Sequence, residues 1–222
     1  MELSIDTASD RAGVALSQEG RVLVELSWGV GHRHARELMP AVAEALSRAG
    51  ASKADLTAVF VNIGPGSYVG LRVGVSAAKG LAYGLGVPLV GVGRLELDAY
   101  PYLGYPARLV PVHRAGRGEV AWAVYLTAGG VTVEQRSPRM TSPEIMLASV
   151  EEPALFCGDL DDGLRGELKA AGWTVAPHRN AGRRPACLAE LGWRRLREGR
   201  THDPKTLAPL YLREPAIGPQ SP

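Results

Sequence analysis

The chain has 222 residues, 45% of them hydrophobic, and a formal net charge of +2 at pH 7. A chain of this length forms one large domain or two small ones that share an interface. The small net charge argues against a protein that binds nucleic acid over its whole surface, and the two cysteines, Cys157 and Cys187, stand in no metal-binding or disulfide pattern.

No apolar run approaches the roughly 18 residues that a membrane span needs. The first residues lack the basic segment that begins a signal peptide. We therefore expect a soluble, cytoplasmic protein that does not contact a membrane.

The first half of the sequence changes repeatedly between the periodicities of strands and helices. Gly50 closes the first predicted helix, and the continuous apolar run at 58–63 indicates a buried strand. The predicted elements are strands at 3–6, 14–16 and 22–24, a helix at 35–49, a strand at 58–63, a helix from Ser67 to Leu85, and a strand at 87–92.

The pattern begins again after the segment 104–106, which predicts an α/β fold with two similar halves. The second half is predicted to hold strands at 109–112, 120–126 and 131–135, a short helix from Ser142, a strand at 154–157, a helix at 164–171, a strand at 174–176 and a helix at 185–198. We expect one domain at 1–104, joined by 203–213, a second at 105–202, and a disordered tail at 214–222.

The segment Gly64 to Gly74 follows a buried strand and opens a helix, where backbone N–H groups can hold an anion. Pro65 removes one such N–H. The next strand ends in glycine and not in the acid that binds a ribose, and Lys79 lies too deep in the helix to serve as a phosphate-binding lysine. The spacing favours a structural turn with close helix packing over a phosphate site.

Asp6-Thr7 follows the first strand and precedes an antiparallel one, an arrangement similar to the phosphate-binding hairpin of the actin, sugar-kinase and Hsp70 superfamily. Those enzymes bind nucleotide between this hairpin and a second Gly-rich loop in the other half. Here the first loop has no glycine before Gly13, and the second half offers only Gly158-Asp159. We interpret this site as a vestigial phosphate loop, with the residues Asp6, Thr7, Gly64, Gly66 and Ser67.

The five histidines form no recognisable catalytic or metal-binding pattern. His32 and His34 are two residues apart, and Leu38 stands where a same-face partner of His34 would be needed. We expect no catalytic residue, no metal and no cofactor. The arginine-rich stretch 179–200 could face a tRNA backbone, but its lack of interleaved aromatic residues favours a solvated helix face.

Five stretches of the chain together resemble the TsaB family, over residues 3 to 213. They are Ile5-Asp6-Thr7 with Val14-Ala15-Leu16, His34 to Pro40, Gly64 to Gly74, Arg117 to Val120, and Pro209 to Arg213. The chain departs from the family pattern at Val69 and His113, where the family usually has Thr and Asp.

The resemblance implies a duplicated actin-like (ASKHA) fold with mixed sheets flanked by helices. It also implies a non-catalytic scaffold that pairs with the catalytic paralogue TsaD and the ATPase TsaE. Together these proteins transfer a threonylcarbamoyl group to the adenosine next to the anticodon of tRNAs that read codons beginning with A, and tRNA is bound only within that complex. An independent kinase of the sugar-kinase superfamily and a dinucleotide-binding oxidoreductase stay open as alternatives.

The second predicted helix has too much apolar surface to be covered by one sheet. Its long polar side chains fall within one narrow stripe, whereas a helix on a sheet needs only about a third of its circumference apolar. We therefore predict that a TsaD-type paralogue, or a second copy of the chain, covers the rest through Leu38, Met39, Val42, Leu71, Val75, Ala78 and Ala82. On this hypothesis Val75→Arg blocks both associations and leaves the fold intact.

Overall fold

The computed structural model describes residues 1–29, 34–128, 131–177 and 185–213. The predicted disordered tail at 214–222 and the side chains of His32 and His34 lie outside the described part.

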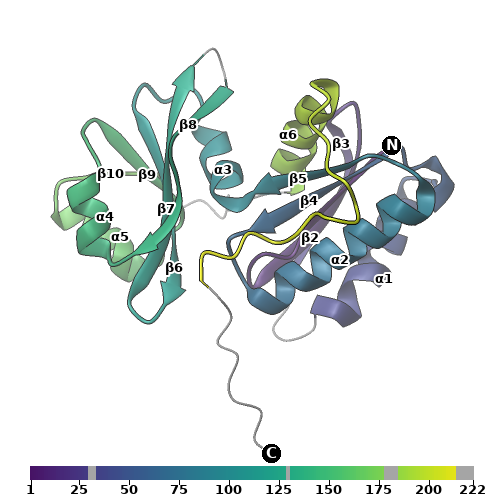
Figure 1. Cartoon of the computed structure of the whole chain (residues 1–222), viewed down its shortest axis with the longest axis horizontal. Helices are drawn as coiled ribbons and strands as arrows, with labels where there is room; N and C mark the ends of the chain where they lie inside the picture. Colours follow the sequence, from purple (N-terminus) through teal and green to yellow (C-terminus); the bar gives the residue numbers. More distant parts are fainter. Residues whose placement is uncertain (30–33, 129–130, 178–184, 214–222) are drawn as a thin grey trace, which may run out of the picture.

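The chain forms two five-stranded mixed sheets that lie side by side (Figure 1). The first sheet has the order β3-β2-β1-β4-β5, and β1 is antiparallel to β2 and parallel to β4. Its strands are β1 (Glu2–Asp6), β2 (Arg11–Gln18), β3 (Arg21–Gly29), β4 (Ala58–Gly64) and β5 (Leu89–Gly93).

The second sheet repeats this plan, with the order β10-β9-β6-β7-β8. Its first strand, β6, is likewise antiparallel to the following β7 and parallel to β9. The strands are β6 (Arg108–Gly116), β7 (Glu119–Ala128), β8 (Val131–Thr141), β9 (Ala154–Asp159) and β10 (Thr174–Val175). The repeated order and directions confirm the prediction of two similar α/β halves.

Four helices cover the outer faces of the sheets, and two lie between the sheets (Figure 1). The outer helices are α1 (His34–Arg48) and α2 (Tyr68–Leu85) on the first sheet, and α4 (Pro143–Ser149) and α5 (Asp162–Ala170) on the second. The inner helices are α3 (Arg94–Ala99) and α6 (Pro185–Arg197), and the short 3₁₀ helices are η1 (Lys53–Asp55) and η2 (Tyr100–Tyr102). None of the described helices is long and apolar enough to cross a membrane.

Each half contributes one inner helix that packs on the sheet of the other half. Helix α3 follows β5, yet its Leu95 and Ala99 pack with Leu109 and Ala123 of the second sheet. Helix α6 follows β10, but it packs on the strands of the first sheet. Helix α6 agrees with the helix predicted at 185–198, whereas α3 was not among the predicted elements.

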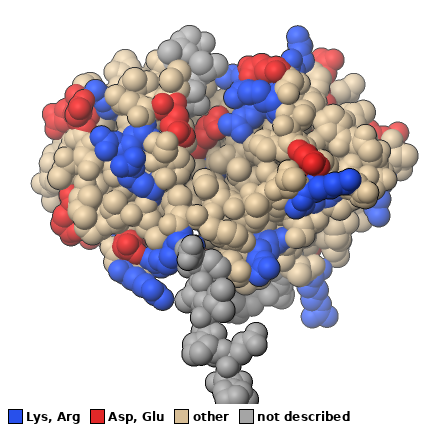
Figure 2. Space-filling model, in the orientation of Figure 1, with Lys and Arg blue, Asp and Glu red and all other residues tan. Residues whose placement is uncertain are grey.

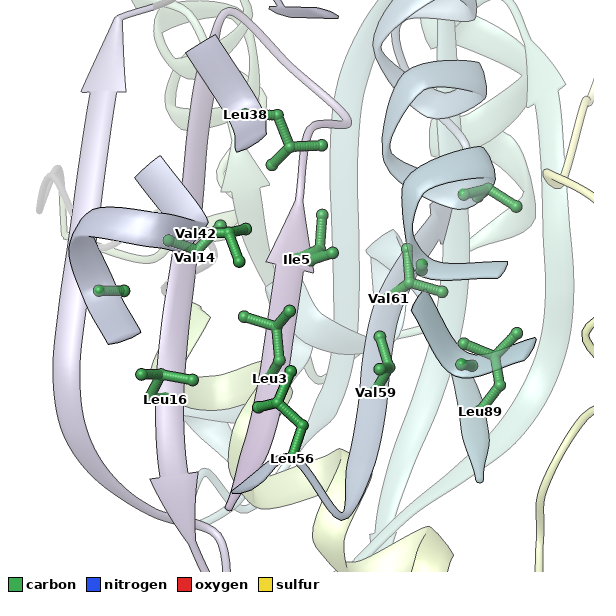
Figure 3. Packing of buried hydrophobic residues seen from close by; sticks show 14 of the residues in the cluster. Leu3, Ile5, Val14, Leu16, Leu38, Val42, Leu56, Val59, Val61 and Leu89 are labelled. Carbon is green, nitrogen blue, oxygen red and sulfur yellow. The ribbon is translucent and has the colours of Figure 1, made fainter. Parts of the chain in front are cut away.

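The alternation of side chains along the central strands creates two core layers in the first half, as strand geometry requires. Leu3 and Ile5 of β1 and Val59 of β4 face α1 and α2 (Figure 3). The intervening Phe60 faces α6, where it packs with Leu188.

The segment 202–213, which we call the C-terminal strap, returns to the first half and runs beside β5 and α2 (Figure 1). His202 pairs with Leu89, and the N–H of Leu210 donates to the carbonyl of Ile63 at 2.7 Å. Lys79, which lies in the middle of α2, donates through Nζ to the carbonyl of Leu207 at 2.8 Å. The lysine therefore holds the strap against the helix.

Two helical glycines give a matched test of the packing. A Cβ on Gly192 of α6 would lie 2.3 Å from Cγ of buried Phe60, whereas a Cβ on Gly80 of α2 would meet no atom within 4 Å. We expect Gly192→Ala to destabilise the protein by about 1–3 kcal/mol through overpacking. Gly80→Ala should instead stabilise it by about 0.5–1 kcal/mol through helix propensity. Urea unfolding measures both, and equal effects would contradict the described contact between α6 and β4.

Candidate functional site

A cleft of about 980 Å³ lies between the two halves. Crevices at the carboxyl ends of parallel strands are the usual ligand sites of α/β folds. The cleft is lined by Asp6 from the end of β1, Ser67 before α2, Arg94 from α3, Asp159 from the end of β9, and Tyr211 from the strap. The structure thus brings the vestigial phosphate loop and the end of β9 to the same place.

The loop after β1 is occupied by the chain's own contacts. The carbonyl of Ala8 accepts the Ser67 N–H at 2.9 Å, and Oγ1 of Thr7 donates to the carbonyl of Gly70 at 2.7 Å. The start of α2 is therefore bonded directly to the loop after β1.

The glycines of the Gly64 to Gly74 segment allow this close approach. A Cβ on Gly66 would lie 2.1 Å from the carbonyl oxygen of Ala8, and one on Gly74 would lie 2.1 Å from Oγ1 of Thr7. No other residue fits at either place. The contacts agree with the interpretation of this segment as a turn for tight helix packing, and Ser67 caps α2 by accepting the Gly70 N–H at 3.2 Å.

Asp6 lies buried at the floor of the cleft, and its Oδ1 accepts the N–H of Ala8 at 3.0 Å. The carboxylate thus closes the turn of its own loop, as Asp side chains commonly do.

The loop after β9 is also engaged within the chain. Gly158 has φ +95°, which favours glycine, and a Cβ there would lie 2.8 Å from the carbonyl oxygen of Val112. Asp159 forms an ion pair with Arg94, at 2.9 Å between Oδ2 and Nη2.

Arg94 is the cleft residue that the sequence did not indicate. It is 4% exposed, and it donates to the first loop through Nη1, at 3.4 Å from the carbonyl oxygen of Ala8. It belongs to no recognisable motif, and its six-residue helix is too short to show a period. An arginine directly after a buried strand was the one available signal.

On the second half, His113 is the last buried residue of β6, and the exposed Arg114 follows it. His113 is 6% exposed, and its Nδ1 lies 3.1 Å from the carbonyl oxygen of Arg114. Arg114 pairs with Asp161, at 2.6 Å between Nε and Oδ2. The N–H of Leu164 at the start of α5 and the Arg114 guanidinium both lower the pKa of Asp161.

The strap closes one side of the cleft and ties the two halves together. Tyr211 packs on Tyr68 in a tilted arrangement with 5.2 Å between ring centroids, and Arg213 forms an ion pair with Glu119 at the start of β7. The segments 117–120 and 209–213, both of which carry the family resemblance, therefore meet in space.

Comparisons with known proteins identify the family. The family model for TsaD, described as tRNA N6-adenosine threonylcarbamoyltransferase, matches residues 29–152. The TsaB protein of Bacillus subtilis (strain 168), described as a tRNA threonylcarbamoyladenosine biosynthesis protein, is 32% identical over 95% of this chain and 93% of its own length. This chain belongs to the TsaB family.

Solved structures agree on the fold. A Pseudomonas aeruginosa protein described as similar to the peptidase YeaZ matches with a TM-score of 0.79 and 24% identity, over 96% of this chain and 99% of its own. The activator of the 2-hydroxyisocaproyl-CoA dehydratase from Clostridium difficile, with bound ADPNP, matches with a TM-score of 0.53 and 8% identity, over 95% and 99%. With the duplicated strand order, these likenesses confirm the predicted actin-like fold.

The structure places six of the seven predicted interface residues of this TsaB-family chain inside its own core. Leu38, Val42, Leu71, Val75, Ala78 and Ala82 are each at most 2% exposed. Figure 3 shows Leu38 and Val42 pointing at the strands of the first sheet. The interface prediction is therefore wrong for these six, because the flank of α2 that we assigned to a partner packs on α1 and the sheet. Met39, at 39% exposed, is the one that reaches the surface.

Val75→Arg should consequently prevent cooperative folding, in contrast to the expectation from sequence. It would place a charge among core residues that include Ile5, Leu38 and Val61, and an unpaired buried charge costs several kcal/mol. Circular dichroism and urea unfolding test this. A Val75→Arg variant as stable as the unaltered protein would contradict the burial of Val75.

Two arginines in the described part of the arginine-rich stretch, Arg194 and Arg195, make contacts within the fold. Arg195 donates to the carbonyl of Gly91 at 2.6 Å and pairs with Glu96, and the Arg194 guanidinium lies 5.8 Å from the Tyr100 ring centroid. Arg179, Arg183 and Arg184 lie outside the described residues. Acidic and basic side chains are interspersed on the face shown in Figure 2.

His202 makes the attachment of the strap depend on pH. Its Nδ1 accepts the Gly91 N–H at 3.1 Å, so the imidazole must be neutral there. Partial burial, and then the charge of Arg195, lower the pKa of His202 below 6.5. The unfolded chain therefore binds more protons just below that pH. The stability contribution is complete above pH 6.5 and is lost as the pH falls through the folded pKa.

We expect His202→Asn to remove this dependence, because Oδ1 of asparagine can take the place of Nδ1 and does not titrate. Urea midpoints at about pH 7.5 and about pH 5.5 give the comparison. The unaltered protein should lose more stability over this interval than the variant does. An equal loss would show that His202 does not anchor the strap.

Proposed function

We propose that this chain is a non-catalytic subunit of the machinery that attaches a threonylcarbamoyl group to the adenosine next to the anticodon of tRNAs reading codons that begin with A. Its partners would be a TsaD-type catalytic paralogue and a TsaE-type ATPase, and tRNA would be bound only within the complex. Membership of the TsaB family supports the pathway. The single observation that supports the non-catalytic role is the hydrogen bond from the Ser67 N–H to the carbonyl of Ala8, because it engages a donor at the start of α2 that a phosphate would need free.

The same contacts weigh against the two alternatives. A sugar-kinase-like enzyme needs free N–H groups in both loops, whereas the N–H groups of Ala8 and Ser67 are bonded within the chain. In the other loop, the Arg94 guanidinium lies against Asp159. A dinucleotide-binding enzyme needs an acid after the second parallel strand to bind a ribose, and β5 is followed by Arg94.

The surface that remains for a partner is the exposed face of α1 and α2, opposite the core. Three large apolar side chains on it are exposed: Met39 by 39%, Val69 by 62% and Tyr83 by 65%. Gly80 lies on this face with no chain atom near its Cβ position, so another helix could approach closely there. We propose that the paralogue and a second copy of this chain compete for this face.

The association test compares two substitutions that each introduce an arginine at the surface. Gly80→Arg places a charge on the proposed face and should fold, since a Cβ at this exposed position meets no atom of the chain within 4 Å. Ile145→Arg places the same charge on α4, at a side chain that is 57% exposed. We expect Gly80→Arg to weaken both associations by more than about tenfold, because an unpaired charge is costly at a buried contact. Ile145→Arg should leave them unchanged. Light scattering and calorimetry with the TsaD-type protein measure this, and equal binding by both variants would place the interface elsewhere.

The role itself is tested by reconstitution of tRNA modification from the TsaD-type and TsaE-type proteins, supplied with tRNA, ATP and threonylcarbamoyl adenylate as the donor, with and without this chain. We expect modified adenosine only in the complete mixture, and neither modified tRNA nor peptide hydrolysis from the isolated chain. Equal yields with and without the chain would refute the subunit role. Free cysteines at 157 and 187 support a reducing, cytoplasmic location for this activity.

A further inference from the structure

Arg94 bridges the two loops that face each other across the cleft. Its Nη1 donates to the carbonyl of Ala8 in the first loop at 3.4 Å, and its Nη2 donates to Oδ2 of Asp159 in the second at 2.9 Å. Its Nε lies 3.6 Å from Oδ2 of Asp98, one turn along α3. One guanidinium therefore contacts both halves of the fold.

We propose that Arg94 is a built-in lock between the halves, which takes the place that a bound nucleotide has in nucleotide-binding proteins of this fold. Such a nucleotide is gripped by the loop after β1 and by the loop of the other half. Here a cation from the chain itself lies between the same loops. The planar guanidinium suits this place, since its donors point in several fixed directions at once.

The burial of the side chains that form the lock shows which of its contacts are strong. The side chains of Arg94 and Asp98 are 5% and 0% exposed, whereas that of Asp159 is 63% exposed. An exposed ion pair contributes little, but loss of one partner of a buried pair leaves an uncompensated charge. The durable part of the lock is therefore the buried Arg94–Asp98 pair together with the carbonyl of Ala8.

This part suffices to join the halves because α3 itself packs on the second sheet. Leu95 and Ala99, which directly follow Arg94 and Asp98 in α3, lie among side chains of β6, β7 and β9. Arg94 thus connects a loop of the first sheet with a helix fixed to the second. Gly158 leaves space for the pair, because a Cβ there would lie 3.4 Å from Oδ2 of Asp98.

A further bridge lies at the mouth of the cleft, where Arg213 of the strap pairs with Glu119. Both bridges are made within the chain. The arrangement of the halves should therefore be the same with and without nucleotide.

The experiment measures the distance between the halves by double electron–electron resonance (DEER) between two spin labels. Ser47→Cys on α1 and Ile145→Cys on α4 place the labels on exposed positions of opposite halves. Cys187→Ala removes the accessible thiol, and Cys157 is 0% exposed. The distribution of distances between the two labels is recorded for the protein with Arg94 and Asp98 unchanged, with and without Mg–ATP. It is then recorded for three variants.

Arg94→Lys keeps a charge beside Asp98 and so should fold, but one ammonium group cannot hold Ala8 and Asp159 together. Arg94→Met combined with Asp98→Leu removes the buried pair as a unit, so that no charge stays unpaired. The control is Asp161→Ser, which removes a cleft carboxylate whose partner Arg114 is in the same half and keeps a capping oxygen for α5.

We expect one narrow distribution for the unaltered lock, unchanged by Mg–ATP and by Asp161→Ser. Both Arg94 variants should broaden it by about twofold or more, because the halves then lose the polar contact that fixes their relative position across the cleft, and relative motion of domains is otherwise the default. Thermal unfolding checks that each variant is folded. Folded Arg94 variants with an unaltered distribution would overturn the proposal. So would an unaltered protein whose broad distribution narrows when Mg–ATP is added.

Discussion

The fit between the loop after β1 and the start of α2 is the constraint on which the rest of the site depends. Thr7 and Ala8 bond directly to backbone groups of the α2 region, and they can do so because Gly66 and Gly74 carry no Cβ. This fit places the first turn of α2 at the floor of the cleft and leaves the opposite face of the helix at the surface. The glycines of the Gly64 to Gly74 segment thereby bring the start of α2 directly against the loop after β1.

The exchange of inner helices makes the two halves one structural unit. Helix α3 lies against the second sheet and helix α6 against the first, so neither sheet is covered without a helix from the other half. Lobes that share their cores in this way need only a few polar contacts to fix their relative position. Arg94 at the floor of the cleft and the strap at its mouth supply such contacts.

The sequence predicted most elements of the fold because their signals are local. The apolar run at 58–63 became β4, and the helix predicted from Ser67 to Leu85 became α2 with Ser67 as its cap. Helix α3 was missed because six residues buried on two sides show no helical period. The packing of α6 on the first sheet was not predicted, because periodicity shows which side of a helix is apolar but not which sheet covers it.

The candidate site was predictable only in part, for the same physical reason. Asp6 and the Gly64 to Gly74 segment follow strands and could be placed at one edge of a sheet, but the bridge made by Arg94 depends on how the halves meet. The flank of α2 around Val75 illustrates the limit most clearly. An apolar flank is equally compatible with a partner and with the chain's own core, and only the packing of α1 on α2 decides between them.

Hydrogen exchange at the Ser67 amide tests the central claim, that the contact between the first loop and α2 is a permanent part of the core. This N–H is bonded to the carbonyl of Ala8 at 2.9 Å in the free protein. The account predicts that it exchanges only through global unfolding, with the same free energy of opening as the amides of the core strands. Exchange at the rate of an open loop, with the central strands still protected, would contradict it.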